Sequence, residues 1–229
     1  MIRAILMDFN GVIINDEPLQ LKAYQEILKD DGISFTEEEY YECAGMDDLR
    51  FVQEQFKRAG KEITDEKAAE IIARKTAAWK KIVEKEVPLF EGVENFIKKC
   101  ARRFAIGIVS MAKREEIEHI LMRTGLADSF TAIISAEDIK ECKPNPECYL
   151  EGFRKLDAAR MAQGHYPLVH RECLVIEDAP AGVRAGKQAG MKILAVTNTF
   201  DEKSLREAGA DSVTENLDDW MPESIAQTF

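Results

Sequence analysis

The sequence lacks paired cysteines, an excess of basic charge and long apolar runs. Its five cysteines are an odd number with no C-x-x-C pair among them, so neither a disulfide framework nor a zinc knuckle is expected. A net charge of −11 disfavours nucleic acid and anionic membranes, because phosphate binders need a basic face. No apolar run approaches a membrane span or the core of a signal peptide. We therefore expect a cytoplasmic protein with no nucleic-acid or membrane partner.

Three common catalytic patterns are missing as well. The three histidines do not stand at metal-ligand spacing beside carboxylates. The run GVRAGKQ, residues 182–188, is one residue short of P-loop spacing and carries Gln188 where a P-loop has Ser or Thr. Ser110 lacks the G-x-S-x-G pattern of a serine hydrolase. These three mechanisms are therefore disfavoured.

Short apolar runs alternate with helical patterns through most of the chain. The runs are continuously apolar rather than alternating, which is typical of parallel strands covered on both faces. The pattern predicts an α/β core with a doubly wound, Rossmann-like parallel sheet. The predicted strands are residues 2–8, 104–109, 131–134, 173–176 and 192–196.

Residues 17–86 interrupt this alternation with helical patterns and no convincing strand. Thr36 and Glu39 form the pattern of a capping box at one helix start. We expect residues 1–16 and 87–229 to form the α/β core, with 17–86 as an inserted helical cap above the strand ends. The apolar stripes of these helices contain Leu21, Tyr24, Ile27, Leu28, Leu49, Val52, Phe56, Ala68, Ile71, Ile72, Trp79, Ile82 and Val83.

Polar residues stand at the ends of the predicted strands. Asp8 ends the first, Ser110 follows the second and Glu177-Asp178 ends the fourth, while Lys143 follows the third after a loop. One such residue alone more often caps a helix or forms a turn. Because the carboxyl ends of parallel strands face one crevice, four of complementary type indicate a common site.

This set of residues suits phosphoryl transfer. The Asp8 carboxylate can attack phosphorus and carry the group as an acyl phosphate. Asp8 and Asp178 can hold Mg²⁺, which prefers oxygen ligands. Ser110, at the start of a predicted helix, can bind a phosphate oxygen, and Lys143 can offset the negative charge.

The same motifs resemble those of the haloacid dehalogenase superfamily, in its phosphatase and β-phosphoglucomutase-like branch. DFNGVI is similar to the nucleophile loop, GIVS to the second motif, ECKPNPECYL to the lysine motif and VIEDAPAGVRAGKQAG to the acidic metal motif. The resemblance implies Asp8 as nucleophile, with Ser110 and Lys143 in the catalytic set. It further implies Mg²⁺ held by Asp8, the backbone carbonyl of Asn10 and Asp178, with Glu177 in support, and a helical cap that closes over the substrate.

Asn10 departs from the family pattern, in which this position is usually an aspartate that acts as general acid and base. An amide has no titratable proton, and general acid–base catalysis is typically worth about 10²–10⁴ in rate. Three explanations stay open. Asn10 is native in an enzyme for substrates with good leaving groups, or it is an engineered replacement, or the protein binds phosphate ligands without catalysis.

Further departures concern the substrate contacts that the resemblance implies. Gln20 stands where the mutases have a cap histidine, and Arg50 lies two places beyond the position of a mutase arginine. Lys75 matches a cap lysine and lies on an otherwise apolar stripe, so it is either a snorkelling surface lysine or a cation that faces the substrate. The full expected substrate-binding set is Gln20, Arg50, Lys75, Ser110, Met111 and Lys143.

The function expected from these observations is a Mg²⁺-dependent phosphatase or phosphotransferase for a small phosphorylated metabolite. A β-phosphoglucomutase-like sugar phosphomutase and a catalytically impaired phosphometabolite-binding protein are the alternatives. A dehalogenase is disfavoured, because it would have no use for Glu177-Asp178 as a magnesium pair. Residues 157–170 carry no functional assignment, and a monomer is the default expectation.

Overall fold

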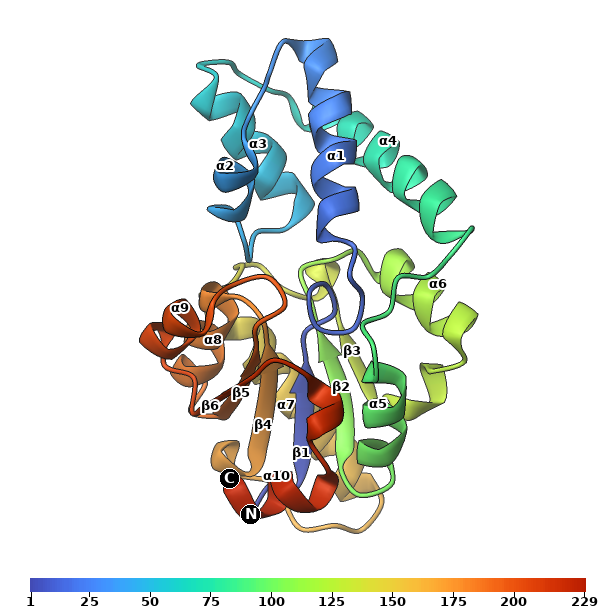
Figure 1. Ribbon diagram of the computed structural model, residues 1–229, viewed down its shortest axis with the longest axis vertical. Helices are drawn as coiled ribbons and strands as arrows, with labels where there is room; N and C mark the ends of the chain where they lie inside the picture. Colours follow the sequence, from blue (N-terminus) through green and yellow to red (C-terminus); the bar gives the residue numbers. More distant parts are fainter.

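Six parallel strands form a single sheet in the computed structural model, which describes residues 1–229 (Figure 1). The strand order is β3-β2-β1-β4-β5-β6, so β1 lies in the middle and the chain winds outward in both directions. The doubly wound α/β fold is therefore confirmed. The strands are β1 (Ala4–Met7), β2 (Ala105–Val109), β3 (Ala132–Ile134), β4 (Cys173–Glu177), β5 (Lys192–Val196) and β6 (Ser212–Thr214).

The register of the sheet aligns the strand ends that carry the polar residues. Met7 on β1 pairs with Ile108 on β2 and with Ile176 on β4. Asp8 therefore follows β1 at the level where β2 and β4 also end. One edge of the sheet thus collects residues that are far apart in the sequence.

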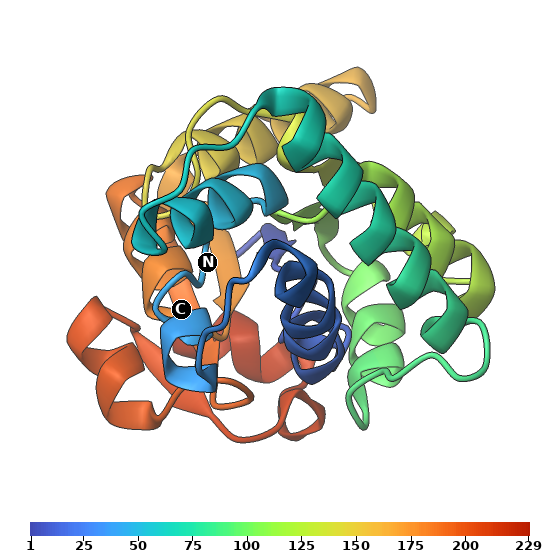
Figure 2. The ribbon, with the colours of Figure 1, turned by 90° about the horizontal axis from the view of Figure 1, so that it is seen from above.

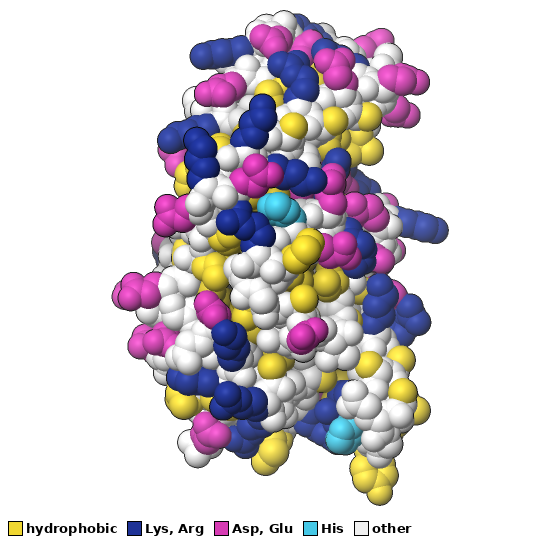
Figure 3. All heavy atoms as spheres, turned by 90° about the vertical axis from the view of Figure 1, so that its right-hand side faces the viewer, with side chains coloured by type: hydrophobic (Ala, Val, Ile, Leu, Met, Phe, Trp, Pro, Cys, Tyr) yellow, Lys and Arg dark blue, Asp and Glu magenta, His cyan; other side chains and the backbone are white.

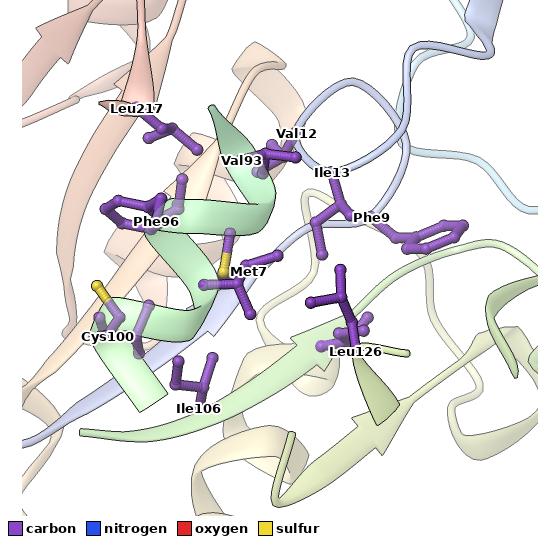
Figure 4. Packing of buried hydrophobic residues seen from close by; sticks show 14 of the residues in the cluster. Met7, Phe9, Val12, Ile13, Val93, Phe96, Cys100, Ile106, Leu126 and Leu217 are labelled. Atoms are coloured by element: carbon purple, nitrogen blue, oxygen red, sulfur yellow. The ribbon is translucent and has the colours of Figure 1, made fainter. Parts of the chain in front are cut away.

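Helices cover both faces of the sheet and bury an apolar core on each. Ile5 and Met7 point to the face covered by α5 and α6, whereas Ala4 and Leu6 point to the face covered by α7 and α8. Figure 4 shows Met7 beside Phe96 of α5 within the first of these cores. The core helices are α5 (Val93–Ala101), α6 (Arg114–Thr124), α7 (Glu147–Ala162), α8 (Pro180–Gln188), α9 (Glu202–Ala208) and α10 (Pro222–Thr228). Single 3₁₀ turns are η1 (Lys29–Asp31), η2 (Ala127–Ser129), η3 (Ala136–Asp138), η4 (His170–Glu172) and η5 (Leu217–Asp219).

Four further helices lie above the carboxyl edge of the sheet, as Figures 1 and 2 show from the side and from above. They share a separate hydrophobic cluster that includes Tyr24, Phe51 and Ile71. The capping box at the start of α2 is present, since the Glu39 amide donates to Thr36 Oγ1 at 3.2 Å and the Thr36 amide donates to Glu39 Oε2 at 2.7 Å. These helices are α1 (Glu17–Leu28), α2 (Glu37–Tyr41), α3 (Asp48–Arg58) and α4 (Asp65–Val83).

Some local expectations were wrong. Leu49 and Ile82 were placed on buried stripes, yet they are 42% and 41% exposed, because each lies at the solvent edge of its helix. The strand β6 was not predicted; it has only three residues, all partly exposed at the edge of the sheet. Residues 157–162 complete α7, so only the remainder of 157–170 connects α7 to η4.

The surface carries charges of both signs. Figure 3 shows Lys and Arg side chains interspersed with Asp and Glu over the face that it presents. No helix of the structure combines the length and the apolar character needed to cross a membrane.

Candidate active site

Three carboxylates meet where β1 and β4 end. Oxygen atoms of Asp8, Glu177 and Asp178 all lie within 4.8 Å of one another. Two glycines allow this approach. A Cβ built on Gly11, where φ is +75°, would lie 1.9 Å from Asp178 Oδ2, and a Cβ on Gly182 would lie 1.8 Å from Glu177 Oε1. Side chains at these two positions would displace the carboxylates, so the glycines are required for the cluster.

Lys143 binds the same cluster from the loop after β3. Its Nζ lies 2.9 Å from Asp8 Oδ2 and 2.6 Å from Glu177 Oε1, and it donates to the Val109 carbonyl at 3.3 Å. Glu177 Oε1 also accepts a hydrogen bond of 2.6 Å from the Tyr149 hydroxyl. Lys143 is therefore held against the carboxylate that was predicted to be the nucleophile.

The electrostatics of the cluster favour a bound cation. Burial raises the pKa of Asp8 to about 7, although Lys143 acts in the opposite direction. Burial and the charges of Glu177 and Asp8 raise the pKa of Asp178 well above its ordinary value. Burial would lower the pKa of Lys143, but the two neighbouring carboxylates raise it overall. Because one lysine does not balance three carboxylates, an all-oxygen cluster of this kind fits a hard divalent ion such as Mg²⁺.

Ser110 stands directly after β2 and faces Asn10. Its Oγ accepts a hydrogen bond from the Ala112 amide at 3.0 Å and donates to Asn10 Oδ1 at 3.4 Å. The residues that follow lead into α6, whose N-terminus favours negative charge. Ser110 is thus placed between the carboxylate cluster and a helix start, where a phosphate oxygen can bind.

Asn10 is held by a residue that the sequence reasoning missed. Its Nδ2 donates to Asp16 Oδ1 at 2.9 Å. Asp16 is fully buried, and its Oδ2 accepts from Gln20 Nε2 at 3.0 Å and from Trp79 Nε1 at 2.7 Å. Three neutral donors therefore hydrogen-bond to the buried Asp16 carboxylate, and this network fixes the orientation of the Asn10 side-chain amide.

A cavity that is partly open to solvent connects this edge of the sheet with the helices above it. Of the expected substrate-binding residues, Gln20, Ser110, Met111 and Lys143 lie on its wall, and Arg50 and Lys75 do not. Asp8, Asn10 and Asp178 also line it, whereas Glu177 lies behind Lys143.

The two basic side chains that do not line the cavity, Lys75 and Arg50, form ion pairs with carboxylates of the protein. Lys75 is 1% exposed, and its Nζ lies 2.8 Å from Asp48 Oδ2 and 3.1 Å from Glu116 Oε1. It is therefore not a snorkelling surface lysine. Arg50 lies 2.9 Å from Asp47 Oδ2 and donates to the Lys140 carbonyl. Both side chains link α3 or α4 to the α/β core.

Glu17 is a further cavity residue that the sequence reasoning missed. It lines the cavity, and its Oε2 accepts a hydrogen bond from the Tyr40 hydroxyl at 2.8 Å. Burial and the charge of Asp16 raise its pKa to about 7. The available signal was the pair of acidic residues that opens the helical insert immediately after the DFNGVI loop.

Comparisons with known proteins agree with this geometry. A phosphorylated carbohydrates phosphatase of Thermotoga maritima is 27% identical over 212 residues, which cover 90% of this chain and 91% of that protein. Hexitol phosphatase B of Escherichia coli (strain K12) is 27% identical over 202 residues, or 85% and 83% of the two chains.

Solved structures share the fold over the whole chain. A crystal structure of β-phosphoglucomutase from Clostridium difficile superposes with a TM-score of 0.86 at 21% identity, covering 100% of this chain and 97% of that one. At this identity the likeness concerns the fold. The profile of the haloacid dehalogenase-like hydrolases matches residues 5–196, so the resemblance seen in the motifs is confirmed and the chain belongs to the haloacid dehalogenase-like hydrolase family.

Proposed function

We propose that the protein is a Mg²⁺-dependent phosphatase or phosphotransferase that acts on a small phosphorylated metabolite through an aspartyl phosphate at Asp8. The observation that carries the proposal is the contact between Asp8 and Lys143 inside the carboxylate cluster, at 2.9 Å. The phosphatases among the relatives support the same class of reaction.

Each residue of the site has a role in this proposal. Asp8, the Asn10 carbonyl and Asp178 would hold Mg²⁺, with Glu177 in support; the ion would offset the charge between the nucleophile and the phosphate. Ser110 binds a phosphate oxygen. Lys143 orients Asp8 and favours its ionised form, because its ammonium group lies against Asp8 Oδ2.

The reaction would proceed in two displacements. An Asp8 oxygen attacks phosphorus, and the bond from phosphorus to the leaving oxygen breaks. A water oxygen then attacks the same phosphorus, Asp8 departs as a carboxylate, and the proton of the water passes to the released phosphate. Asn10 can supply no proton in the first displacement, so the leaving group must depart as an unprotonated anion. The carboxylate released from an acyl phosphate and the phosphate released from pyrophosphate can do so.

The Asp16 network favours Asn10 as a native part of the site. An aspartate at position 10 would bring two carboxylates to the 2.9 Å separation that Asn10 and Asp16 now have. Like charges this close cannot both ionise readily. The amide at position 10, the buried acid at 16 and the donors Gln20 and Trp79 therefore form a matched set.

We further propose that residues 17–86 act as a cap over the core formed by 1–16 and 87–229. Cap and core both contribute to the cavity wall, for example through Glu17 and Ser110. Closure would exclude water from the acyl phosphate and complete the substrate site.

The proposal is tested by phosphate release from acyl, pyrophosphate and alkyl phosphate substrates with Mg²⁺. We expect acyl phosphates to be hydrolysed at least about a hundredfold faster than alkyl phosphates, since only the latter require the missing acid. Asp8→Asn should abolish both activities. Measurable binding of phosphate esters without any release would instead favour the binding protein, and interconversion of sugar phosphate isomers would favour the phosphomutase.

A further inference from the structure

The two ends of the cavity differ in charge. At the sheet end, Asp8, Asp178 and Lys143 line the wall, and Lys143 contacts Asp8. At the end under the helices, the wall carries Glu17, Asp48 and Glu116, and no lysine or arginine lines that end. A phosphate and its metal suit the first end, so the second end must accommodate the rest of the substrate.

The carboxylates at the helical end are not neutralised by the protein. Lys75 is shared by Asp48 and Glu116, so one positive charge faces two negative charges. Glu17 forms no ion pair, and its recorded hydrogen bond comes from the neutral Tyr40 hydroxyl. When all three carboxylates are ionised, two negative charges therefore remain uncompensated at this end. A second phosphate or a carboxylate on the substrate would be repelled there.

Aromatic rings form another part of this wall. The rings form a continuous series of contacts. The ring centroids are 4.5 Å apart for Tyr24 and Phe51, 5.4 Å for Phe51 and Tyr40, and 5.3 Å for Tyr40 and Tyr41. Tyr41 continues the series to Phe200 of the core, at 6.0 Å. All five rings line the cavity. Aromatic faces attract organic cations, and the attraction is strongest where water is excluded.

Gln20 supplies an acceptor that lacks a donor. It lines the cavity and is 6% exposed. Its Nε2 donates to Asp16 Oδ2, but its buried Oε1 accepts no hydrogen bond in the protein. A buried acceptor without a partner is costly, so an N–H group of a ligand at this position would satisfy it.

Given the proposed function, we infer that the substrate carries a protonated amine on the part distant from the reacting phosphate, as an aminoacyl phosphate does. Carboxylates, aromatic faces and a free amide oxygen together recognise an alkylammonium group. A neutral hydroxyl would satisfy Gln20 alone, and an anionic group would satisfy none of the three.

The test compares matched alkyl phosphates of two to six carbons whose far end is an amine, a hydroxyl or a carboxylate. These esters lack a good leaving group and therefore serve as slowly hydrolysed analogues for measuring binding. Binding is measured by calorimetry with Mg²⁺ at pH 8, on the wild type and on Asp8→Asn, so that the result does not depend on turnover. A primary amine resembles lysine, with a pKa of about 10.4, and stays protonated at this pH. At the best chain length we expect the amine to bind at least about tenfold tighter than the hydroxyl, a factor equal to about 1.4 kcal/mol, and the carboxylate to bind most weakly.

Two variants on helix α1 test whether Glu17 recognises the amine. Glu17→Gln should reduce the ratio of amine to hydroxyl affinity several-fold, whereas Glu26→Gln, an exposed glutamate on the same helix α1, should leave the ratio unchanged. Equal affinities for amine and hydroxyl at every length, or tighter binding of the carboxylate, would overturn the inference. Absence of an acyl phosphate at Asp8 would overturn the proposed function alone, because the affinity ratio is measured separately.

Discussion

The side-chain amide of Asn10 donates a hydrogen bond of 2.9 Å to the buried carboxylate of Asp16. This contact ties the residue next to the proposed nucleophile to the start of the helical insert. Gln20 and Trp79 donate to the same carboxylate, so the site loop, α1 and α4 share one acceptor. The departure from the family pattern at position 10 is thus part of a network rather than an isolated exchange.

Replacing Asn10 with aspartate should create a general acid. The new carboxyl group would share a proton with Asp16, which keeps it protonated near neutral pH. We expect Asn10→Asp to raise the turnover of alkyl phosphates by about 10²–10⁴. Mg²⁺ affinity should change little, because a backbone carbonyl does not depend on its side chain. The measurement is kcat for an alkyl phosphate, with Asn15→Asp, an exposed change in the same loop, as the control. Equal rates for Asn10→Asp and the wild type would refute the assignment.

The indole of Trp79 should stabilise the fold through Asp16. Trp79→Phe removes the 2.7 Å hydrogen bond to a buried carboxylate, and such bonds are worth about 1.5–3 kcal/mol. We expect a loss of this size in the free energy of unfolding, measured by urea denaturation. Trp220→Phe is the matched control, because Trp220 is partly exposed and its ring stacks on Phe229 at the surface end of the chain rather than contacting Asp16. Similar effects of the two changes would argue against the network.

The buried lysine of α4 should be required for the attachment of the helices to the core. Lys75→Met would leave Asp48 and Glu116 without their shared cation, at a cost of about 3–5 kcal/mol. The additional change Glu116→Gln should restore part of the loss. Lys80 on the same helix offers an exposed comparison, since it lies 2.8 Å from Glu115 and its replacement by Met should cost at most about 1 kcal/mol. Urea denaturation of the wild type and these three variants would show whether burial makes this difference.

Glu17 should make the stability depend on pH. Burial and the charge of Asp16 raise its pKa to about 7, from 4.5, so between these values the folded state holds a proton that the unfolded state has lost. The free energy of unfolding therefore falls as pH rises through this window. Because Glu17 is partly exposed, the fall should be on the order of 1–3 kcal/mol. Glu17→Gln should remove this part of the slope, and Glu26→Gln should retain it. A slope that is the same in all three proteins would exclude Glu17 as its source.

The sequence predicted the sheet well where strands are continuously apolar. The four longest strands, β1, β2, β4 and β5, are almost wholly buried, so their composition alone indicates a covered parallel sheet. The edge strand β6 has a side chain exposed to some degree at each of its three positions, which leaves no such signal. Helix α7 was not predicted, since its apolar positions are weakly periodic and Gly152 interrupts them.

The residues of the candidate site also differ in how far the sequence could predict their positions. Asp8, Ser110 and Lys143 could be placed together because strand ends of a parallel sheet meet at one edge. The partners of Asp16 could not, because Trp79 lies 63 positions away on a different helix. The unusual position of Lys75 on an apolar stripe was visible in the sequence. Its two carboxylate partners come from α3 and α6, and their approach depends on tertiary packing.

The most direct test of the whole account is the covalent state of Asp8 during turnover. Protein mixed with Mg²⁺ and an acyl phosphate is quenched in acid, digested and analysed by mass spectrometry, with Asp8→Asn and Ser129→Ala, a surface change far along the chain, treated alike. We predict one phosphoryl group on the peptide that contains Asp8 in the wild type and in Ser129→Ala, and none in Asp8→Asn. A phosphoryl group on another residue, or none with any donor while phosphate is released, would contradict the account.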